Sequence, residues 1–249
     1  MRHRPKKRFG QHFLHDQGVL ARIVDAIDPR QGDALVEIGP GEGALTRRLV
    51  ERAGSVTAIE IDRDLADALE AEFPRNRLAL HRADALAFDF GALPAGARIV
   101  GNLPYNISTP ILFRLAESGS RFRDLHFMLQ LEVVDRMVAA HSTPEYGRLS
   151  VMLQARFAMR KLFKVSAGAF RPPPKVESAM VRMTPLHGED LPQAFAEVVR
   201  RAFSARRKTL RNALGLAPER FAALGLDPGL RPENLSPRDY VRIAATCAL

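Results

Sequence analysis

Cysteine and tryptophan are almost absent from this sequence of 249 residues, which has no tryptophan and a single cysteine, Cys247. One thiol excludes an internal disulfide framework, and it also excludes a zinc site built from several cysteines. Long hydrophobic runs are absent too, because no apolar stretch approaches the ~18 residues that a membrane-spanning helix requires. We therefore expect a cytoplasmic protein without a metal site and without a membrane partner.

Acidic residues are missing from two stretches that are rich in lysine and arginine. Residues 2–8 contain five basic side chains and residues 200–211 contain six, and neither stretch has an aspartate or a glutamate. The whole chain carries a formal net charge of +9. Excess positive charge supplies affinity for phosphate that does not depend on sequence. One such stretch is often only a solvated helix face, but two of them favour a nucleic-acid partner.

Strand-like and helix-like segments alternate along the first half of the chain. Residues 44–52 and 64–73 have helical patterns, and short apolar segments around them indicate strands at 34–38, 55–61, 78–81, 98–100 and 125–129. Alternation of this kind favours an α/β fold, in which a parallel sheet carries helices on both faces.

The pattern changes towards the C-terminus. Two extended segments around Pro172–Pro174 predict an antiparallel edge, and from about residue 191 only helical patterns remain. The last of these begins with Ser236-Pro237-Arg238-Asp239, a typical helix start. We expect two domains: a catalytic domain at 1–185 with a basic arm at 1–15, and a small all-helical domain at 186–249.

A glycine-rich turn follows the first expected strand, in Val36-Glu37-Ile38-Gly39-Pro40-Gly41-Glu42-Gly43. Glycines let a ligand approach the backbone, and the N-terminus of the next helix favours negative charge. For the glycines alone, an ordinary tight turn is an equally good interpretation. Carboxylates after the next two strands strengthen the case for a ligand. Glu60 lies 21 residues after Gly39, the separation at which a carboxylate accepts from ribose hydroxyls, and Asp84 is placed to accept from an adenine amine.

Helix capping is the alternative for each carboxylate, but together these strand ends predict a nucleoside site. The nucleoside belongs either to NAD or to S-adenosylmethionine. NAD enzymes typically have G-x-G-x-x-G, and here the third glycine, Gly43, comes too early. The fourth strand end also offers an amide and a tyrosine rather than the proton donor or acceptor that a dehydrogenase needs. We therefore favour S-adenosylmethionine.

The fourth strand ends in the segment Gly101-Asn102-Leu103-Pro104-Tyr105-Asn106-Ile107-Ser108-Thr109-Pro110. An adenine amine is a poor nucleophile because its lone pair is conjugated with the ring. The Asn102 oxygen and a backbone carbonyl of Leu103-Pro104 would accept its two hydrogens and leave the lone pair aimed at a methyl group. Pro104 stiffens the turn, and the Tyr105 ring offers a base a stacking surface worth roughly 1–3 kcal/mol. A base in paired RNA would have to be flipped out to reach this pocket.

The Asn-Leu-Pro-Tyr motif is far more specific than the glycines, and it resembles a motif of the ribosomal RNA adenine N6,N6-dimethyltransferases, in particular the bacterial KsgA/RsmA branch. Similar motifs follow in order along nearly the whole chain: Lys7–Leu14, Val36–Gly43, Glu60–Asp62, Asp84-Ala85, Gly101–Pro110, Gln130–Val134, Tyr146–Val151, Phe170–Ala179, Phe203–Asn212 and Glu233–Ser236. The resemblance implies a Rossmann-like class I S-adenosylmethionine-dependent methyltransferase sheet followed by a small helical domain.

The resemblance also implies roles for individual residues. The residues implied to bind the cofactor are Gln11, His12, Leu14, Gly39, Gly41, Glu60, Asp84 and Asn102. The residues implied to act on the target amine or to bind RNA are Asn102, Leu103, Pro104, Tyr105, Phe170, Arg206, Arg207, Lys208 and Arg211. Position 12 is often asparagine in this family, so packing of the N-terminal loop is an alternative for His12. For Phe170, core packing is as good an expectation as a contact with the base.

The activity implied by the resemblance is the transfer of four methyl groups to two adjacent adenosines. These adenosines lie in the loop of the 3′-terminal hairpin of 16S ribosomal RNA, and the substrate is a late pre-30S particle. We expect a monomer that binds no DNA. The alternatives are a resistance methyltransferase that acts on large-subunit RNA, an assembly factor for which methylation is secondary, and a DNA adenine methyltransferase. The last of these would carry a target-recognition domain that this sequence lacks.

Overall fold

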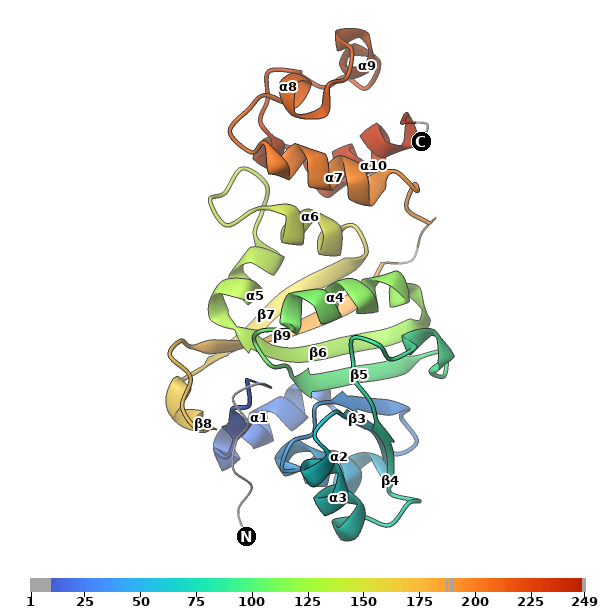
Figure 1. The fold of residues 1–249 in the computed structure, drawn as a ribbon, viewed down its shortest axis with the longest axis vertical. Helices are drawn as coiled ribbons and strands as arrows, with labels where there is room; N and C mark the ends of the chain where they lie inside the picture. Colours follow the sequence, from blue (N-terminus) through green and yellow to red (C-terminus); the bar gives the residue numbers. More distant parts are fainter. Residues whose placement is uncertain (1–9, 187, 189, 248–249) are drawn as a thin grey trace. The chain divides into compact units, whose positions relative to one another are not determined.

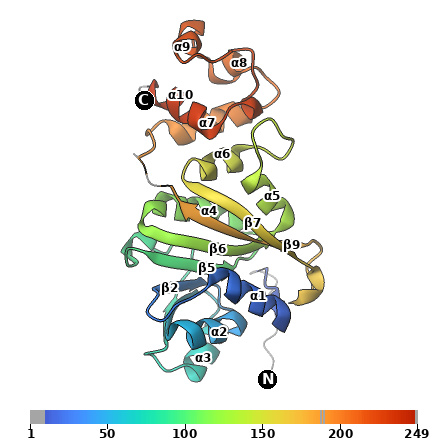
Figure 2. The same ribbon diagram turned by 180° about the vertical axis from the view of Figure 1, so that it is seen from behind.

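The computed structural model describes residues 10–186, 188 and 190–247, and these residues form two compact units. The first unit consists of the described residues of Met1–Val134 and Met159–Pro185, and the second of those of Asp135–Ala158 and Leu186–Leu249. Figures 1 and 2 show the chain from two sides. Each unit has its own hydrophobic core, so the two units are described in turn.

The first unit is built on a seven-stranded sheet with the strand order β4-β3-β2-β5-β6-β9-β7. Strands β2 to β6 pair in parallel, and β9 is antiparallel to β6. This mixed sheet confirms the expected α/β class. The strands are β2 (Leu35–Ile38), β3 (Val56–Glu60), β4 (Leu78–Arg82), β5 (Ala97–Asn102), β6 (Phe122–Gln130), β7 (Phe157–Val165) and β9 (Ser178–Pro185).

Helices cover both faces of the sheet. Helix α4 (Ser108–Glu117) lies in front of the sheet in Figure 1 and behind it in Figure 2, whereas α1 (Gln17–Ile27) lies on the other face. The other helices are α2 (Ala44–Ala53) and α3 (Arg63–Glu72), and α5 (Leu131–Val138) begins in the first unit and ends in the second.

Two further strands form a small separate sheet. Strand β1 (Phe13–Leu14) pairs antiparallel with β8 (Phe170–Arg171). This pairing holds the N-terminal segment against the chain that leads into β9. Edge strand β7 has no counterpart among the expected strands. Its nine residues place three cations among apolar side chains without regular alternation, so it lacks the pattern of a half-buried strand.

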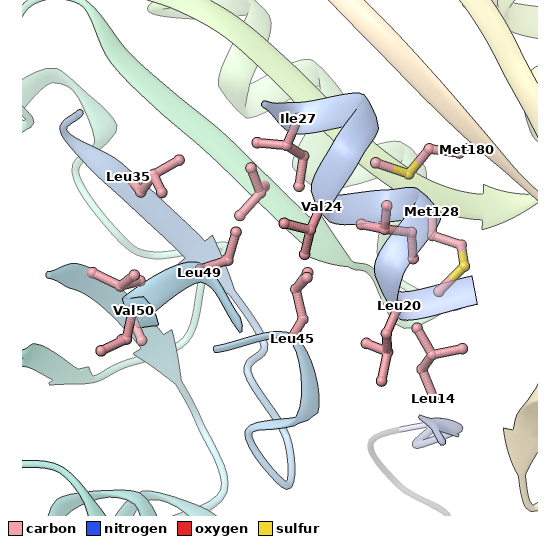
Figure 3. Close-up of a cluster of buried hydrophobic side chains, with 14 of the residues drawn as sticks. Leu14, Leu20, Val24, Ile27, Leu35, Leu45, Leu49, Val50, Met128 and Met180 are labelled. Atoms are coloured by element: carbon pink, nitrogen blue, oxygen red, sulfur yellow. The ribbon is translucent and has the colours of Figure 1, made fainter. Parts of the chain in front are cut away.

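Helix α1 anchors the core on its side of the sheet. Asp16 caps its N-terminus by accepting a hydrogen bond from the Val19 N–H at 2.9 Å. The buried side chains of α1 follow the three- and four-residue spacing of one helix face, and Figure 3 shows them packed against Met128 and Met180 from the sheet. The α1 residues in this cluster are Leu20, Ile23, Val24 and Ile27.

The second unit is helical and has a core of its own. Its helices are α6 (Arg148–Gln154), α7 (Phe195–Ser204), α8 (Leu210–Leu214), α9 (Pro218–Ala223) and α10 (Pro237–Ala245). Ser236 and Asp239 form the expected capping box at the start of α10. The division of the chain differs from the single boundary expected near residue 186. Residues 135–158 belong with the C-terminal helices because Tyr146 and Val151 are buried in their core.

A buried cation ties the first unit together. Arg98 on β5 is 4% exposed, and its guanidinium bonds both oxygens of Asp124 on β6 at 2.9 and 3.0 Å. It also bonds Asp33 at 2.7 Å and the backbone carbonyls of Ile27 and Asp28 at the end of α1. Burial by itself would raise the pKa of Asp124, but contacts with His126 and Arg98 outweigh it and lower that pKa, so the carboxylate stays charged.

We predict that Arg98→Ala lowers the free energy of unfolding by about 3–5 kcal/mol, because it leaves the Asp124 carboxylate buried without its partner. Urea unfolding followed by circular dichroism measures the change. Arg30→Ala is the control, since Arg30 pairs with Asp28 at 2.7 Å on the surface and exposed pairs contribute less than about 1 kcal/mol. Equal losses in the two variants would contradict the prediction.

Candidate active site

A cleft opens at the carboxyl ends of β2, β3 and β5 in the first unit. Because these strands are parallel and adjacent, the residues that follow them meet at one edge of the sheet. The N-terminal segment forms a further wall of the cleft. The sequence-predicted residues that line it are Gln11, His12, Leu14, Gly39, Gly41, Glu60, Asn102, Leu103, Pro104 and Tyr105.

The glycine turn after β2 has the backbone conformation that its residues predict. Gly39 and Gly41 have φ values of +68° and +58°, a region that residues with side chains rarely adopt. A Cβ on Gly39 would stand in open space, so the absence of a side chain keeps the cleft clear there. A Cβ on Gly41 would lie 3.1 Å from the Phe13 ring. Glycine at position 41 therefore lets the N-terminal segment pack directly on the turn.

Glu60 joins the glycine turn to the start of α3. One carboxylate oxygen accepts the Gly41 N–H at 3.2 Å, and the other accepts the Asp62 N–H at 2.8 Å. Glu60 is 5% exposed, and burial raises its pKa. It does not cap α3, because Asp62 does so by accepting from the Asp64 N–H. The Glu60 carboxylate therefore lies in the cleft, with its oxygens held by the backbone.

Asp84 lies outside the lining of the cleft. It follows β4, next to Glu60, since the Ala83 N–H donates to the Glu60 carbonyl at 3.0 Å. Its side chain is exposed and accepts a hydrogen bond from the Leu86 N–H at 2.9 Å. That bond closes a turn at residues 85–87, where the structure has no helix, so it does not amount to the helix capping considered for Asp84. The structure thus brings Asp84 to the correct edge of the sheet but not into the cleft.

The N-terminal segment is tied across the strand ends by side-chain hydrogen bonds. Gln11 Nε2 donates to Asp62 Oδ2 at 3.0 Å, and His12 Nδ1 donates to the Pro172 carbonyl at 2.7 Å. The His12 ring also stacks on the Tyr105 ring, with centroids 5.6 Å apart and an interplanar angle of 27°. The carbonyl of His12 accepts from Asn102 Nδ2 at 3.0 Å.

This last bond orients the Asn102 side chain. A carbonyl only accepts hydrogen bonds, so the amide nitrogen of Asn102 must face His12 and its oxygen must face away. Tyr105 is held at its far end, where its hydroxyl lies 2.7 Å from Ser178 Oγ. Burial raises the pKa of Tyr105, so the phenol stays neutral. The strand end therefore presents an oriented amide oxygen beside a fixed aromatic ring.

Phe170 is part of the hydrophobic core rather than the cleft. It is 2% exposed, lies in the cluster that surrounds α1, and faces Leu14 across the β1–β8 pair. Core packing was one of the two expectations for this residue, and the structure supports that one.

Two polar residues at the inner end of the cleft, Glu37 and His126, escaped sequence reasoning. They lie in one row across the sheet on either side of Val100, so their side chains point to the same face. Glu37 is 2% exposed and accepts from Thr46 Oγ1 at 2.7 Å, and burial raises its pKa to about 7. Within the described chain neither ring nitrogen of His126 has a hydrogen-bond partner, and Nδ1 lies 3.6 Å from Asp124 Oδ1. The sequence signal that could have identified Glu37 and His126 is a charged or polar residue inside an otherwise apolar strand.

The two basic stretches differ in what the structure shows. Residues 2–8 lie outside the described residues. Residues 200–211 span the end of α7, a connecting segment and the start of α8. Arg200 pairs with Glu197, and Arg206 donates to the Pro144 carbonyl at 3.0 Å. The exposed cations of this stretch include the predicted RNA ligands Arg206, Arg207, Lys208 and Arg211.

Comparison with known proteins assigns the family. The model of the family described as ribosomal RNA adenine dimethylase matches residues 2–248. The chain belongs to this family. A ribosomal RNA small subunit methyltransferase A from Thiobacillus denitrificans is 56% identical over 99% of this chain and 99% of its own length. A protein of the same name from Aromatoleum aromaticum is 57% identical, over 97% of this chain and 93% of its own length.

Solved structures agree with this family assignment. A dimethyladenosine transferase from Plasmodium falciparum has a TM-score of 0.79 and 25% identity, over 93% of this chain and 96% of its own. The 23S rRNA methyltransferase ErmE has a TM-score of 0.71 and 28% identity, over 94% of this chain and 98% of its own. The chain is therefore a class I methyltransferase that uses S-adenosylmethionine and acts on RNA.

The residues of the cleft fit this cofactor. Open space at Gly39 allows close approach to the backbone, and the Glu60 carboxylate provides acceptors for hydroxyl groups. The inner end adds the acidic side chain of Glu37 and the His126 ring, whose two nitrogens have no hydrogen-bond partner among the described residues. Among the described residues no cluster of histidine, cysteine and acidic side chains could hold a metal ion, and no helix is long and apolar enough to span a bilayer.

We predict that Glu37→Gln reduces the pH dependence of stability. In the folded state the pKa of Glu37 is about 7, above the ordinary 4.5, so the folded protein keeps a proton that the unfolded chain has lost. Stability therefore falls as the pH rises from about 4.5 to about 7, by at most ~3 kcal/mol. Unfolding free energies measured between pH 5 and pH 8 should fall less in Glu37→Gln than in the wild type. Thr46→Val should extend the fall in unfolding free energy to a higher pH, because the Thr46 hydrogen bond lowers the pKa of Glu37 in the wild type. Parallel pH profiles for all three proteins would contradict the prediction.

Proposed function

We propose that this protein dimethylates the N6 amines of two adjacent adenosines in the 3′-terminal hairpin loop of 16S ribosomal RNA. Its substrate is the pre-30S particle, and it acts as a monomer in the cytoplasm during small-subunit assembly. The observation that carries the proposal is the orientation of Asn102. Its amide nitrogen is occupied by the His12 carbonyl at 3.0 Å, so its oxygen is left to accept from a substrate amine.

Bound S-adenosylmethionine supplies a methyl group on a sulfonium, which is already activated for transfer. The protein's part is to position the amine. Asn102 Oδ1 accepts one hydrogen of the amine and a carbonyl of Leu103-Pro104 accepts the other, which frees the nitrogen lone pair for attack. Each transfer would form an N–CH3 bond, break the S–CH3 bond to leave the neutral thioether S-adenosylhomocysteine, and release one proton of the amine to water. Because two methyl groups are added to each amine, the pocket must also admit the monomethylated amine.

Tyr105 provides the stacking surface for the target base. The His12 ring supports one side of the phenol ring and the Ser178 hydroxyl fixes its far end, so the ring keeps its position when a flipped adenine arrives. A preformed platform reduces the entropy that binding would otherwise lose.

The cofactor contacts that we propose follow the lining of the cleft. The methionine end of the cofactor is covered by Gln11, His12 and Leu14. The absence of side chains at Gly39 and Gly41 lets the cofactor approach the backbone of the turn. Glu60 binds the ribose hydroxyls, and to do so its carboxylate releases one of the two backbone N–H groups that it now accepts from. Asp84 reaches the adenine only if its side chain turns away from Leu86. The basic residues proposed to bind phosphates of the particle are Arg206, Arg207, Lys208 and Arg211.

We predict that the purified protein adds two methyl groups to each of two adenines in small subunits from a strain that lacks these modifications. Mass spectrometry of the 3′ fragment of the RNA detects them. Asn102→Ala should lower the rate at least 100-fold, whereas Asn76→Ala should retain it, because the Asn76 side chain is exposed, lies before β4 and is outside the cleft lining. Methyl groups found only on large-subunit RNA would overturn the proposal in favour of the resistance-type activity.

We also predict that Tyr105→Phe retains most of the activity and Tyr105→Ala loses about 10- to 100-fold in kcat/KM. Phenylalanine keeps the stacking surface and loses only the contact with Ser178, and base stacking contributes roughly 1–3 kcal/mol. Calorimetry with S-adenosylmethionine serves as the control, since both variants should bind the cofactor with similar affinity. If Tyr105→Phe lowers kcat/KM as much as Tyr105→Ala does, the contribution of Tyr105 to activity comes from its hydroxyl and not from base stacking.

A further inference from the structure

Edge strand β7 carries positive charge that the proposed function does not use. The 31 residues from Tyr146 to Val176 contain seven lysines and arginines and no aspartate or glutamate. The part that belongs to the first unit includes Arg160 and Lys164, which are exposed on β7. This acid-free stretch is longer than either of the basic stretches considered from the sequence.

The neighbouring elements add cations to the same surface. Arg160 and Arg182 line one hollow, together with Ala26, Lys161 and Leu162. The Arg182 side chain is 46% exposed and lies 3.5 Å from Asp124. Asp124 is almost fully buried and also bonds Arg98 through both oxygens, so its single negative charge is shared between two guanidinium groups. The hollow therefore carries net positive charge.

Arg22 of α1 extends this surface. Its guanidinium lies over the Phe163 ring, with Cζ 4.2 Å from the ring centroid. Stacking on an aromatic face fixes the plane of the guanidinium and leaves its N–H groups at the rim for another acceptor. Such an arrangement suits the binding of phosphate oxygens.

The cations continue towards the cleft. After β7 the chain passes through a short turn at Ala167–Ala169 into β8, which pairs with β1 in the wall of the cleft. Arg171 and Lys175 are exposed around Pro172, whose carbonyl accepts from His12. We call the surface formed by Arg22, Arg160, Lys164, Arg171, Lys175 and Arg182 the basic strip. Among the described residues no ion pair is formed by Arg160, Lys164, Arg171 or Lys175.

We propose that the basic strip binds the phosphates of the RNA strand that leads into the cleft. This inference rests on the proposed function, which makes the ligand a polyanion. The strip lies in the same unit as the cleft, so it can set the path of the strand whose base is flipped. The cations of the basic strip are spread along a line on the protein surface. A sugar-phosphate backbone, whose charges are also spread along a line, fits this arrangement better than a compact anion, which would need the cations gathered around a single point.

Edge protection is the competing explanation. An edge strand exposes unpaired backbone groups, and lysine or arginine side chains on it prevent pairing with a second molecule. That explanation accounts for Arg160 and Lys164. It does not account for Arg22, Arg171 or Lys175, which lie outside the edge strand.

The test compares two double variants of the full-length protein. Arg160→Ala/Lys164→Ala removes two charges from the basic strip. Arg75→Ala/Arg121→Ala removes two exposed charges elsewhere in the first unit, before β4 and before β6, and neither residue forms an ion pair among the described residues. The probe is a fluorescently labelled RNA hairpin of about 25 nucleotides with two adjacent adenosines in its loop. Its affinity is measured by anisotropy at several salt concentrations.

We expect the strip variant to bind the hairpin about tenfold more weakly than the wild type. The slope of log affinity against log salt should become shallower by about 1.4, since each phosphate contact in a single strand contributes about 0.7. The control variant should keep the wild-type slope. Arg160→Lys/Lys164→Arg should restore binding, because phosphate contacts depend on charge. Calorimetry should give the same S-adenosylmethionine affinity for all variants.

Three results would overturn the inference. The strip variant could keep the wild-type slope, both double variants could lose affinity equally, or the strip variant could self-associate in light scattering while binding RNA normally. The last result would establish edge protection. Methylation by the wild-type protein is measured in a separate assay. If the protein binds RNA through the basic strip but transfers no methyl group, the proposed function is overturned while the inference about the basic strip still holds.

Discussion

The parallel pairing of β2, β3 and β5 is the constraint on which the cleft depends. It brings three strand ends, which are separated by more than sixty residues of sequence, to one edge of the sheet. The N-terminal segment then closes that edge through Gln11 with Asp62 and through the His12 carbonyl with Asn102. The second of these bonds performs two tasks, because it holds the segment in place and it fixes which way the Asn102 amide points.

Buried charges separate the structural part of the first unit from the reactive part. Arg98 satisfies Asp124, Asp33 and the carbonyls at the end of α1, so its charge is fully compensated and it stabilises the sheet. Glu37 and His126 lie in the next row towards the cleft: burial raises the pKa of Glu37, and both ring nitrogens of His126 lack a hydrogen-bond partner among the described residues. A folded protein keeps poorly satisfied polar groups in its interior where a ligand or water completes them. Their position at the inner end of the cleft is consistent with that principle.

Positive charge is distributed over both units and not gathered at the cleft. The cleft itself contains carboxylates, an amide and aromatic rings, which suit a nucleoside and a base. The proposed phosphate ligands lie in the basic strip of the first unit and in residues 200–211 of the second. In the proposed function the cleft selects a base by shape and hydrogen bonds, and the surface cations attract RNA of any sequence.

The sequence by itself determined the alternation of strands and helices, the capping box of α10 and ten of the residues that line the cleft. These features depend on local patterns and on the rule that parallel strand ends share an edge. Only the tertiary structure decided that Phe170 belongs to the core, that Asp84 bonds Leu86, that residues 135–158 join the helical unit and that Glu37 and His126 face the cleft. The positions of Phe170, of residues 135–158 and of Glu37 and His126 depend on contacts between residues distant in sequence, and side-chain burial is settled only when such contacts form. The Asp84 bond is local, but several local partners are open to a carboxylate, and the sequence does not choose among them.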